Sequence, residues 1–213
     1  MGKLYNATWG RFFAAMYDRG LKATEEAGLG EMRRELLTGA AGRVVEIGAG
    51  TGVNLGLYPA TVEDLVVVEP DPYMAKRLRA KLPGTERAVS VVQAPAERLP
   101  FEDASFDTAV ATLVLCTVPD PAAALAEAAR VLRPGGRLLF VEHVRARNPG
   151  LARWQDRLEK PWRFLGDGCH CNRDTVSAIG ESRFEIEELE RDRLPKAPPI
   201  VRPLIRGSAR LSA

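Results

Sequence analysis

Short apolar runs and longer amphipathic segments alternate through the middle of this 213-residue sequence. Apolar runs of this length are typical of strands that are buried on both faces of a sheet. We predict five strands from them, at residues 43–47, 65–69, 89–92, 106–113 and 137–143.

Helices are predicted between several of these strands. The pairs Asp71-Pro72 and Asp120-Pro121 each place an N-cap residue before a first-turn proline. A further helix is expected to open at 53–57, directly after a glycine-rich turn. Strands that alternate with helices pair in parallel through right-handed crossovers, and such sheets bind ligands at the carboxyl ends of their strands.

The two ends of the chain follow other patterns. Residues 7–22 form an amphipathic helix with an aromatic stripe, which suits packing on the core or a lid over a pocket. Residues 25–37 form a second helix, and its polar face is predicted to consist of Glu31, Arg33, Arg34 and Glu35. Near the carboxyl end, the pattern predicts helices at 151–164 and 174–181 and strands at 184–192 and 201–210.

The composition of the chain argues against nucleic-acid binding, a disulfide framework and a membrane span. A net charge of +2 gives nucleic-acid binding no electrostatic support. Three cysteines are too few for a disulfide framework, and no apolar run approaches the roughly 20 residues that span a bilayer. We expect a soluble cytoplasmic protein of unknown oligomeric state, with at most weak association of the amphipathic helix with a membrane surface.

A glycine-rich loop follows the first predicted strand, at Gly48, Gly50 and Gly52. Its spacing differs from those of dinucleotide-binding and P-loop motifs. Glu69 ends the next strand, where a carboxylate can bind the hydroxyls of a ribose. Glu46 precedes the loop and would repel a pyrophosphate but suit a cation. A ligand with a ribose, a positive centre and no phosphate is S-adenosylmethionine.

Several segments resemble the motifs of class I S-adenosylmethionine-dependent methyltransferases. They are residues 45–52, 68–71, 96–101, 105–107 and 130–136. The resemblance implies an α/β fold: a Rossmann-like, mostly parallel seven-stranded sheet with helices on both faces and an antiparallel strand near the C-terminus. It also implies that the cofactor is S-adenosyl-L-methionine.

We expect one methyltransferase domain over residues 1–213. Its parts would be an N-terminal helical cap (1–42), a cofactor-binding core (43–143), a substrate-side helical insert (144–183) and a C-terminal hairpin (184–213).

The resemblance assigns roles within the core. Glu46 and the glycine loop would hold the methionine part of the cofactor, and Glu69 would hold the ribose. Pro95 stands where many relatives have an aspartate that binds the adenine amine, so adenine recognition would fall to Ala96 or Glu97. The full set of expected cofactor residues is Glu46, Gly48, Ala49, Gly50, Gly52, Asn54, Glu69, Pro70, Ala96, Glu97 and Leu113.

Segments outside the core are similar to methyltransferase-like proteins that methylate small alkyl thiols. They are residues 112–118, 142–144, 167–169 and 201–203. Those proteins carry an N-terminal membrane anchor, whereas this sequence begins at the amphipathic helix, so we expect a soluble relative. A small thiol is therefore the leading acceptor.

Other acceptors and other classes stay open. Tyr17-Asp18 matches a pair found in quinone-type C-methyltransferases, so O-, N- or C-methylation of a small aromatic, quinone or natural product is the alternative. Outside the class, the chain could be a nicotinamide-dependent oxidoreductase or a non-catalytic cofactor-binding module.

Candidate catalytic residues are His143, which ends the fifth strand, and Asp167 in a Gly-Asp-Gly turn. His143 could act as a general base, and a structural histidine is an equally good interpretation. Tyr17, Cys169 and His170 are candidates for substrate binding. The motif Cys169-His170-Cys171 is too tightly spaced for the usual zinc pattern, so no metal is expected.

Overall fold

The computed structural model describes residues 3–85 and 87–212, so residues 1–2, 86 and 213 of the expected domain lie outside it. The strands are β1 (Gly42–Ile47), β2 (Val62–Val68), β3 (Val89–Val92), β4 (Phe106–Thr112), β5 (Leu132–His143), β6 (Phe184–Arg193) and β7 (Pro203–Leu211). The helices are α1 (Lys3–Thr24), α2 (Gly30–Leu37), α3 (Pro72–Lys81), α4 (Pro121–Val131), α5 (Pro149–Leu165) and α6 (Thr175–Gly180). Three short segments add a π-helix, η1 (Glu25–Leu29), and two 3₁₀ turns, η2 (Leu82–Gly84) and η3 (Pro199–Val201).

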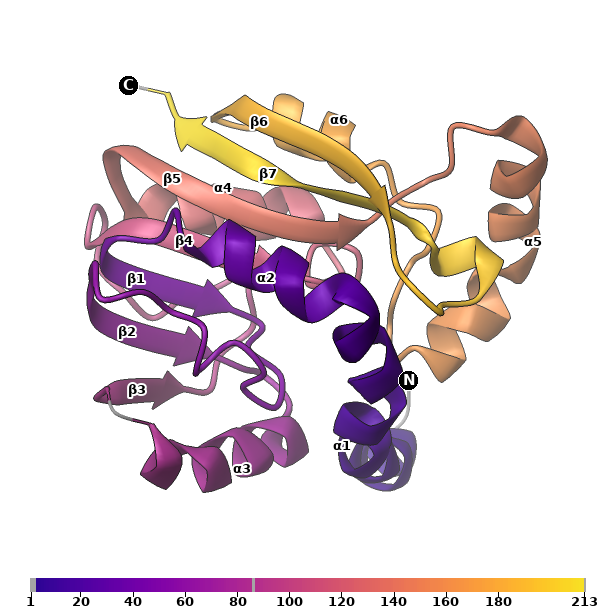
Figure 1. Ribbon diagram of the computed structural model, residues 1–213, viewed down its shortest axis with the longest axis horizontal. Coiled ribbons are helices and arrows are strands. Elements are labelled where there is room, and N and C mark those ends of the chain that lie inside the picture. The colour runs from indigo at the N-terminus through magenta and orange to yellow at the C-terminus, as the bar shows by residue number, and fades with distance from the viewer. Residues whose placement is uncertain (1–2, 86, 213) are drawn as a thin grey trace.

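All seven strands form one sheet in the order β3-β2-β1-β4-β5-β7-β6 (Figure 1). Strands β1 to β5 pair with one another in parallel, and β7 is antiparallel to both β5 and β6. The predicted fold, a mostly parallel seven-stranded sheet with an antiparallel strand near the C-terminus, is confirmed.

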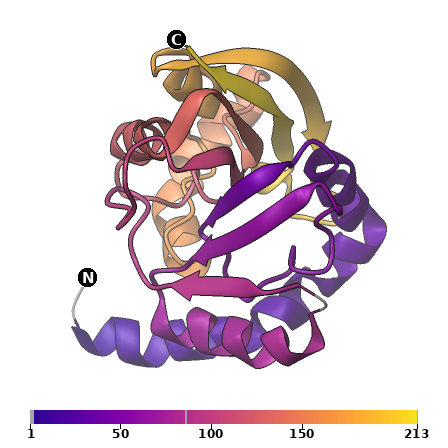
Figure 2. The ribbon, with the colours of Figure 1, turned by 90° about the vertical axis from the view of Figure 1, so that its left-hand side faces the viewer.

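Both faces of the sheet are covered, because successive strand residues point to opposite sides. Val44 and Val110 pack with the side chains of α2 and α3 on one face. Val45 and Ala109 pack with those of α4 and α6 on the other. Figures 1 and 2 show α2 and α4 on opposite sides of the strands.

The predicted N-cap residues Asp71 and Asp120 do begin helices. The Asp71 carboxylate accepts hydrogen bonds from two backbone N–H groups at the start of α3, and that of Asp120 accepts one at the start of α4. Each satisfies N–H groups that have no partner within the helix. Asn148 and Asp174 cap α5 and α6 in the same way.

Two local predictions were wrong. Residues 53–57 form turns rather than a helix. The Asn54 side chain is drawn inward to Glu46 and Thr112, which competes with helix formation. Strand β5 begins at Leu132 rather than Arg137, so the predicted turn at 133–136 lies within the strand, beside an irregularity in its register against β4.

The N-terminal helices are separated by a break. The segment η1 contains Gly28 with φ of 142°, a conformation that favours glycine. The break lets α2 cross the sheet while α1 extends beyond the carboxyl ends of β1 and β2 (Figure 1). Among the described residues, no helix combines the length and apolarity needed to cross a membrane.

Arg33 was predicted on the polar face of α2, and this is wrong. Only 1% of its surface is exposed, whereas Arg34 is exposed. Arg33 lies one helical turn from both Leu29 and Leu37, which are fully buried. That spacing of four is the signal that could have placed it inward.

We predict that Gly207→Ala destabilises the sheet. A Cβ at Gly207 would clash with the carbonyl oxygen of Glu188, next to a register shift in β6. The free energy of unfolding should fall by at least about 1–3 kcal/mol, the usual cost of overpacking. Thermal and denaturant unfolding measure the change. The control is Gly180→Ala, where nothing lies within 4 Å of the added atom, and equal stability of the two variants would contradict the prediction.

Candidate active site

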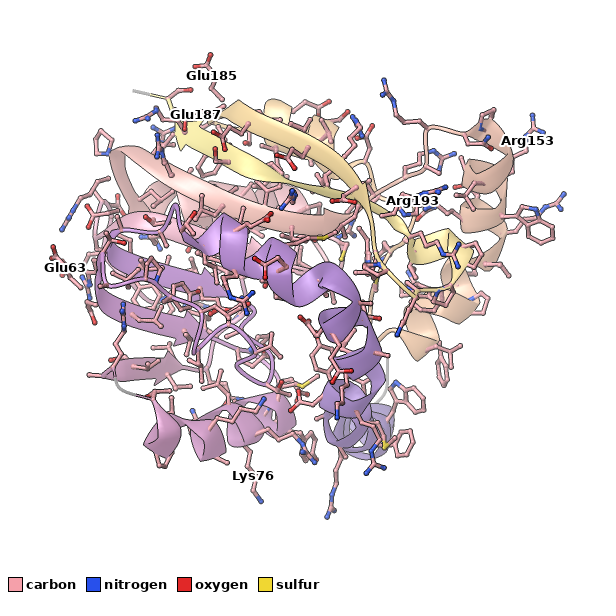
Figure 3. All side chains as sticks on the ribbon, viewed as in Figure 1. Glu63, Lys76, Arg153, Glu185, Glu187 and Arg193 are labelled. Atoms are coloured by element: carbon pink, nitrogen blue, oxygen red, sulfur yellow. The ribbon has the colours of Figure 1, made fainter. Side chains whose placement is uncertain are left out.

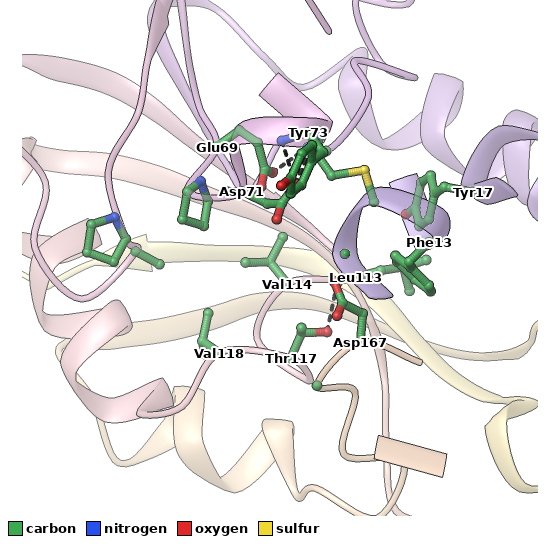
Figure 4. Close-up of a pocket in the computed structure, with 18 of the residues that line it drawn as sticks. Phe13, Tyr17, Glu69, Asp71, Tyr73, Leu113, Val114, Thr117, Val118 and Asp167 are labelled. Atoms are coloured by element: carbon green, nitrogen blue, oxygen red, sulfur yellow. Dashed lines mark hydrogen bonds between the residues drawn. The ribbon is translucent and has the colours of Figure 1, made fainter. Parts of the chain in front are cut away.

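A cavity of about 740 Å³ lies at the carboxyl ends of β1, β2 and β4. Its walls come from the glycine loop, the end of β2, the turns after β3 and β4, helix α1 and the loop after α5 (Figure 4). This is the edge at which open parallel sheets bind their ligands. Seven of the predicted cofactor residues line it: Gly48, Gly50, Glu69, Pro70, Ala96, Glu97 and Leu113.

Glu69 is fixed before any ligand arrives. Its Oε2 accepts the N–H of Gly50 at 2.7 Å, and its Oε1 accepts the N–H of Asp71 at 2.8 Å. Burial raises its pKa to about 7, against the opposing effect of these two hydrogen bonds. Each oxygen keeps acceptor capacity for a hydroxyl donor in the cavity.

The glycine loop needs glycine for its backbone and for its packing. Gly48 has φ of 65°, and a Cβ there would lie 2.7 Å from the Val114 side chain. Gly52 has φ of 78°, and a Cβ there would lie 2.8 Å from the Leu55 side chain. Both the positive φ and the close approach exclude larger residues.

The loop rests on a buried polar network. Glu46 is 1% exposed, and its carboxylate accepts hydrogen bonds from Asn54 Nδ2 at 2.8 Å and Tyr58 Oη at 2.7 Å. Arg33 donates to Thr112 Oγ1 at 2.7 Å and to Asn54 Oδ1 at 3.3 Å. These bonds fix the segment behind the cavity.

Four predicted cofactor residues do not line the cavity: Glu46, Ala49, Gly52 and Asn54. For Glu46 and Asn54, the hydrogen bonds give the reason, since both side chains are engaged with protein partners in the network. The contact of Glu46 with the methionine part stays a prediction, and in this structure its carboxylate lies behind the loop.

A second cavity of about 310 Å³ adjoins the first. The two share Phe13, Tyr17, Leu113, Thr117 and Gly166 in their walls. The residues that line only the second cavity are mostly apolar, with two thiols and one imidazole: Met16, Gly20, Leu21, Cys116, His143, Trp162, Leu165 and Cys169.

Of the predicted catalytic and substrate residues, Tyr17, His143 and Cys169 come together at this second cavity. Asp167 lies instead in the wall of the first cavity, beside Thr117 in Figure 4. His170 lines neither cavity, because its Nδ1 is paired with Glu159 at 3.0 Å. Cys169 thus faces the second cavity, whereas His170 is turned toward Glu159.

The turn after β4 forms the floor that both cavities share, and a residue that the sequence did not suggest holds it in place. Glu142 is fully buried, and its carboxylate accepts the N–H groups of Val114, Leu115 and Cys116 at 2.9, 2.8 and 3.0 Å. Burial raises its pKa well above the ordinary value. The turn begins at Leu113, which has φ of 62°.

Known proteins match this chain in sequence and in fold. Residues 45–140 match the methyltransferase domain family. Human thiol S-methyltransferase TMT1B is 37% identical over 179 residues, covering 81% of this chain and 73% of that protein. Phosphatidylethanolamine N-methyltransferase of Cereibacter sphaeroides is 37% identical over 157 residues, covering 69% and 72%.

A solved structure also matches. It is an S-adenosylmethionine-dependent methyltransferase from Thermotoga maritima, described as a possible histamine N-methyltransferase. Its TM-score is 0.69 at 25% identity, over 95% of this chain and 98% of that one.

With a glycine loop and a fixed Glu69 at the carboxyl edge of this sheet, the chain belongs to the class I S-adenosylmethionine-dependent methyltransferases. Within that class its sequence is close to the thiol S-methyltransferases of the TMT1 type. It is thus an enzyme of methyl transfer, with S-adenosylmethionine as its donor.

The chemistry of the first cavity fits that donor. Four carboxylates line it, from Glu69, Asp71, Glu97 and Asp167, and they suit a cationic ligand without phosphate. When bound, the cofactor supplies a methyl group on a sulfonium, which is already activated for displacement. The protein then needs mainly to align the acceptor with the methyl group.

We expect the Arg33 side chain to contribute strongly to the stability of the protein and the Arg34 side chain to contribute little. Arg33→Ala should lower the free energy of unfolding by about 3–5 kcal/mol, because it leaves buried polar partners unpaired. Arg34→Ala removes an exposed pair with Glu31 and should cost no more than about 1 kcal/mol. Denaturant titration of both variants is the measurement, and equal losses would contradict the assignment.

We predict that S-adenosylmethionine affinity falls as pH is lowered through about 7, because Glu69 then becomes protonated. Glu69→Gln should remove this pH dependence and weaken binding at high pH about tenfold or more, since hydrogen bonds to charged groups contribute about 1.5–3 kcal/mol. Calorimetric titration across this pH range measures both effects. The control is Glu63→Gln on the outer surface (Figure 3), and wild-type pH dependence in Glu69→Gln would refute the role.

Proposed function

We propose that this methyltransferase transfers the methyl group of S-adenosylmethionine to the sulfur of a small, mostly apolar thiol. The observation that carries the proposal is the second cavity, which is apolar, adjoins the cofactor cavity and ends in two thiols and an imidazole. Its volume of about 310 Å³ lies at the small end of the range for ligand sites. The TMT1 relatives, named as thiol S-methyltransferases, support the same acceptor.

Acid–base chemistry also favours a thiol. A thiol with a pKa of about 8.5 is partly ionised near neutrality, whereas a hydroxyl needs a positioned base. Among the described residues that line the second cavity there is no carboxylate to hold an ammonium group or to take a hydroxyl proton. The same observation weighs against an amine acceptor such as the one in the name of the Cereibacter relative.

The shared wall sets the geometry of transfer. A sulfonium methyl beside Leu113 and Thr117 would face the second cavity, because both residues line both spaces. We assign Glu69 to the ribose and the segment at Ala96 and Glu97 to the adenine. His143, at the far side of the second cavity, is the residue we assign to activating the acceptor.

We assign Asp167 to the cofactor side rather than to the acceptor. Its carboxylate lies in the wall of the first cavity, where burial raises its pKa, followed by the effect of Asp71. We also propose that residues 1–213 act as one domain in the cytoplasm, with the segments 1–42 and 144–183 forming the acceptor side. The three free cysteines fit a reducing compartment.

The proposal is tested with three matched acceptors: hexanethiol, hexanol and hexylamine, each with S-adenosylmethionine. We expect the methyl thioether as the product, detected by mass spectrometry, and little methylation of the alcohol or the amine. Preferred methylation of the amine would overturn the thiol assignment.

A variant links the activity to the cavity. Leu21→Trp should fill the second cavity and raise the KM for hexanethiol, while S-adenosylmethionine affinity stays unchanged because Leu21 does not line the first cavity. Ala15→Trp, on an exposed position of α1, is the matched control.

A further inference from the structure

Three side chains from distant parts of the chain meet at the end of the second cavity. Cys116 follows β4, His143 ends β5 and Cys169 lies in the loop after α5. All three are buried, and their ligand atoms lie within 4.8 Å of one another. This convergence is not visible in the sequence, since at least 26 positions separate each from the next.

The three atoms form a triangle of the size found around a metal. The two sulfurs are 3.9 Å apart, and His143 Nδ1 lies 3.4 Å from Cys169 Sγ and 3.8 Å from Cys116 Sγ. Tetrahedral zinc with bonds of about 2.3 Å to sulfur and 2.0–2.1 Å to nitrogen requires about 3.8 Å between sulfurs and about 3.6 Å from sulfur to nitrogen. Each observed side agrees within about 0.2 Å, the tolerance expected of a metal site.

The loops that carry the ligands are held by other bonds. Glu142 fixes the backbone of Cys116, as described above. The N–H of His170 donates to the carbonyl of Cys116 at 2.7 Å, which joins the Cys169 loop to the turn after β4. Arg173 donates to the carbonyls of Leu115 and Val118 at 2.6 and 2.7 Å. The triangle is therefore organised by the protein itself.

The orientation of the imidazole also favours a ligand over a free base. His143 Nδ1 faces the two sulfurs, and Nε2 is buried without a hydrogen-bond partner in the described part of the chain. A base must present a ring nitrogen to the acceptor proton. Neither nitrogen does so here, whereas Nδ1 is placed to bind an ion shared with the thiols.

We propose that Cys116, His143 and Cys169 bind one zinc ion, and that its fourth position takes the acceptor thiol as a thiolate. Three protein ligands with one open position are typical of catalytic zinc. All three ligands line the second cavity, so the open position faces the space assigned to the acceptor. The inference rests on the proposed thiol acceptor and specifies how His143 acts on it.

The acceptor R–SH loses its proton to solvent as the sulfur binds zinc. A sulfur lone pair then attacks the sulfonium methyl, and the electrons of the breaking carbon–sulfur bond remain on S-adenosylhomocysteine. The product R–S–CH₃ is a neutral thioether and leaves the zinc, because it is a weaker ligand than the thiolate.

A zinc site differs from the expectation, drawn from the spacing of Cys169, His170 and Cys171, that the protein binds no metal. That expectation considered only Cys169, His170 and Cys171, and the structure separates them. His170 is paired with Glu159, and Cys171 Sγ lies 3.9 Å from the carbonyl of Gln155. Only Cys169 of the motif joins the cluster.

The test measures metal directly in the full chain, reduced with a phosphine and loaded with zinc chloride. We expect one zinc per chain by elemental analysis. Cys116→Ala and Cys169→Ala should each weaken zinc binding by more than about 100-fold, since loss of an outer-shell partner alone costs about 10–100-fold. Cys171→Ala is the matched control, because this buried cysteine lines neither cavity and should keep full zinc affinity.

A second measurement uses the wild-type protein, so it does not depend on the folding of variants. Cobalt chloride should give thiolate-to-cobalt charge-transfer bands, and hexanethiol but not hexanol should shift them. The inference would be overturned if the protein bound no stoichiometric zinc, or if all three cysteine variants bound zinc equally. It would also be overturned if hexanethiol left the cobalt spectrum unchanged.

The outcomes separate the two proposals. Thiol methylation by protein that contains no zinc would support the proposed thiol acceptor and refute the proposed zinc site. Cysteine-dependent zinc without thiol methylation would remove the thiol acceptor, and with it the proposed use of the fourth position.

Discussion

A single buried carboxylate organises the space in which transfer takes place. Glu142 accepts three consecutive N–H groups of the turn after β4, and that turn supplies the floor of both cavities. Without this acceptor, three buried donors would be unsatisfied, each at a cost of about 1–3 kcal/mol. The same bonds hold Val114 against Gly48 and place Cys116 beside His143. The donor and acceptor sides are thus fixed by one side chain.

The placement of the glycine loop and Glu69 at one edge of the sheet could be predicted from the sequence, because its signals are local. The glycine loop and Glu69 lie at strand ends, and strand ends are found from apolar runs. Their placement in one cavity follows from parallel pairing alone. The resemblance to methyltransferases added residues such as Ala96, which lines the cavity as expected.

Other features depend on packing that no short pattern encodes. The charges around Arg33 suggested a solvent-facing helix side, and only the spacing to Leu29 and Leu37 indicates burial. Residues 53–57 do not form a helix, because the Asn54 side chain points inward and donates a hydrogen bond to Glu46. The contact of His143 with Cys169 depends on how the loop after α5 folds back, and no short pattern in the sequence indicates that Cys169 rather than His170 faces His143.

The position of β7 has a consequence for the order of assembly. This strand lies between β5 and β6, yet it follows both in the chain. During synthesis, β5 and β6 leave the ribosome with their pairing edges open, and they join only when β7 inserts. Unpaired edges are templates for wrong partners. Until β7 has been made, the facing edges of β5 and β6 are therefore both open to such pairing.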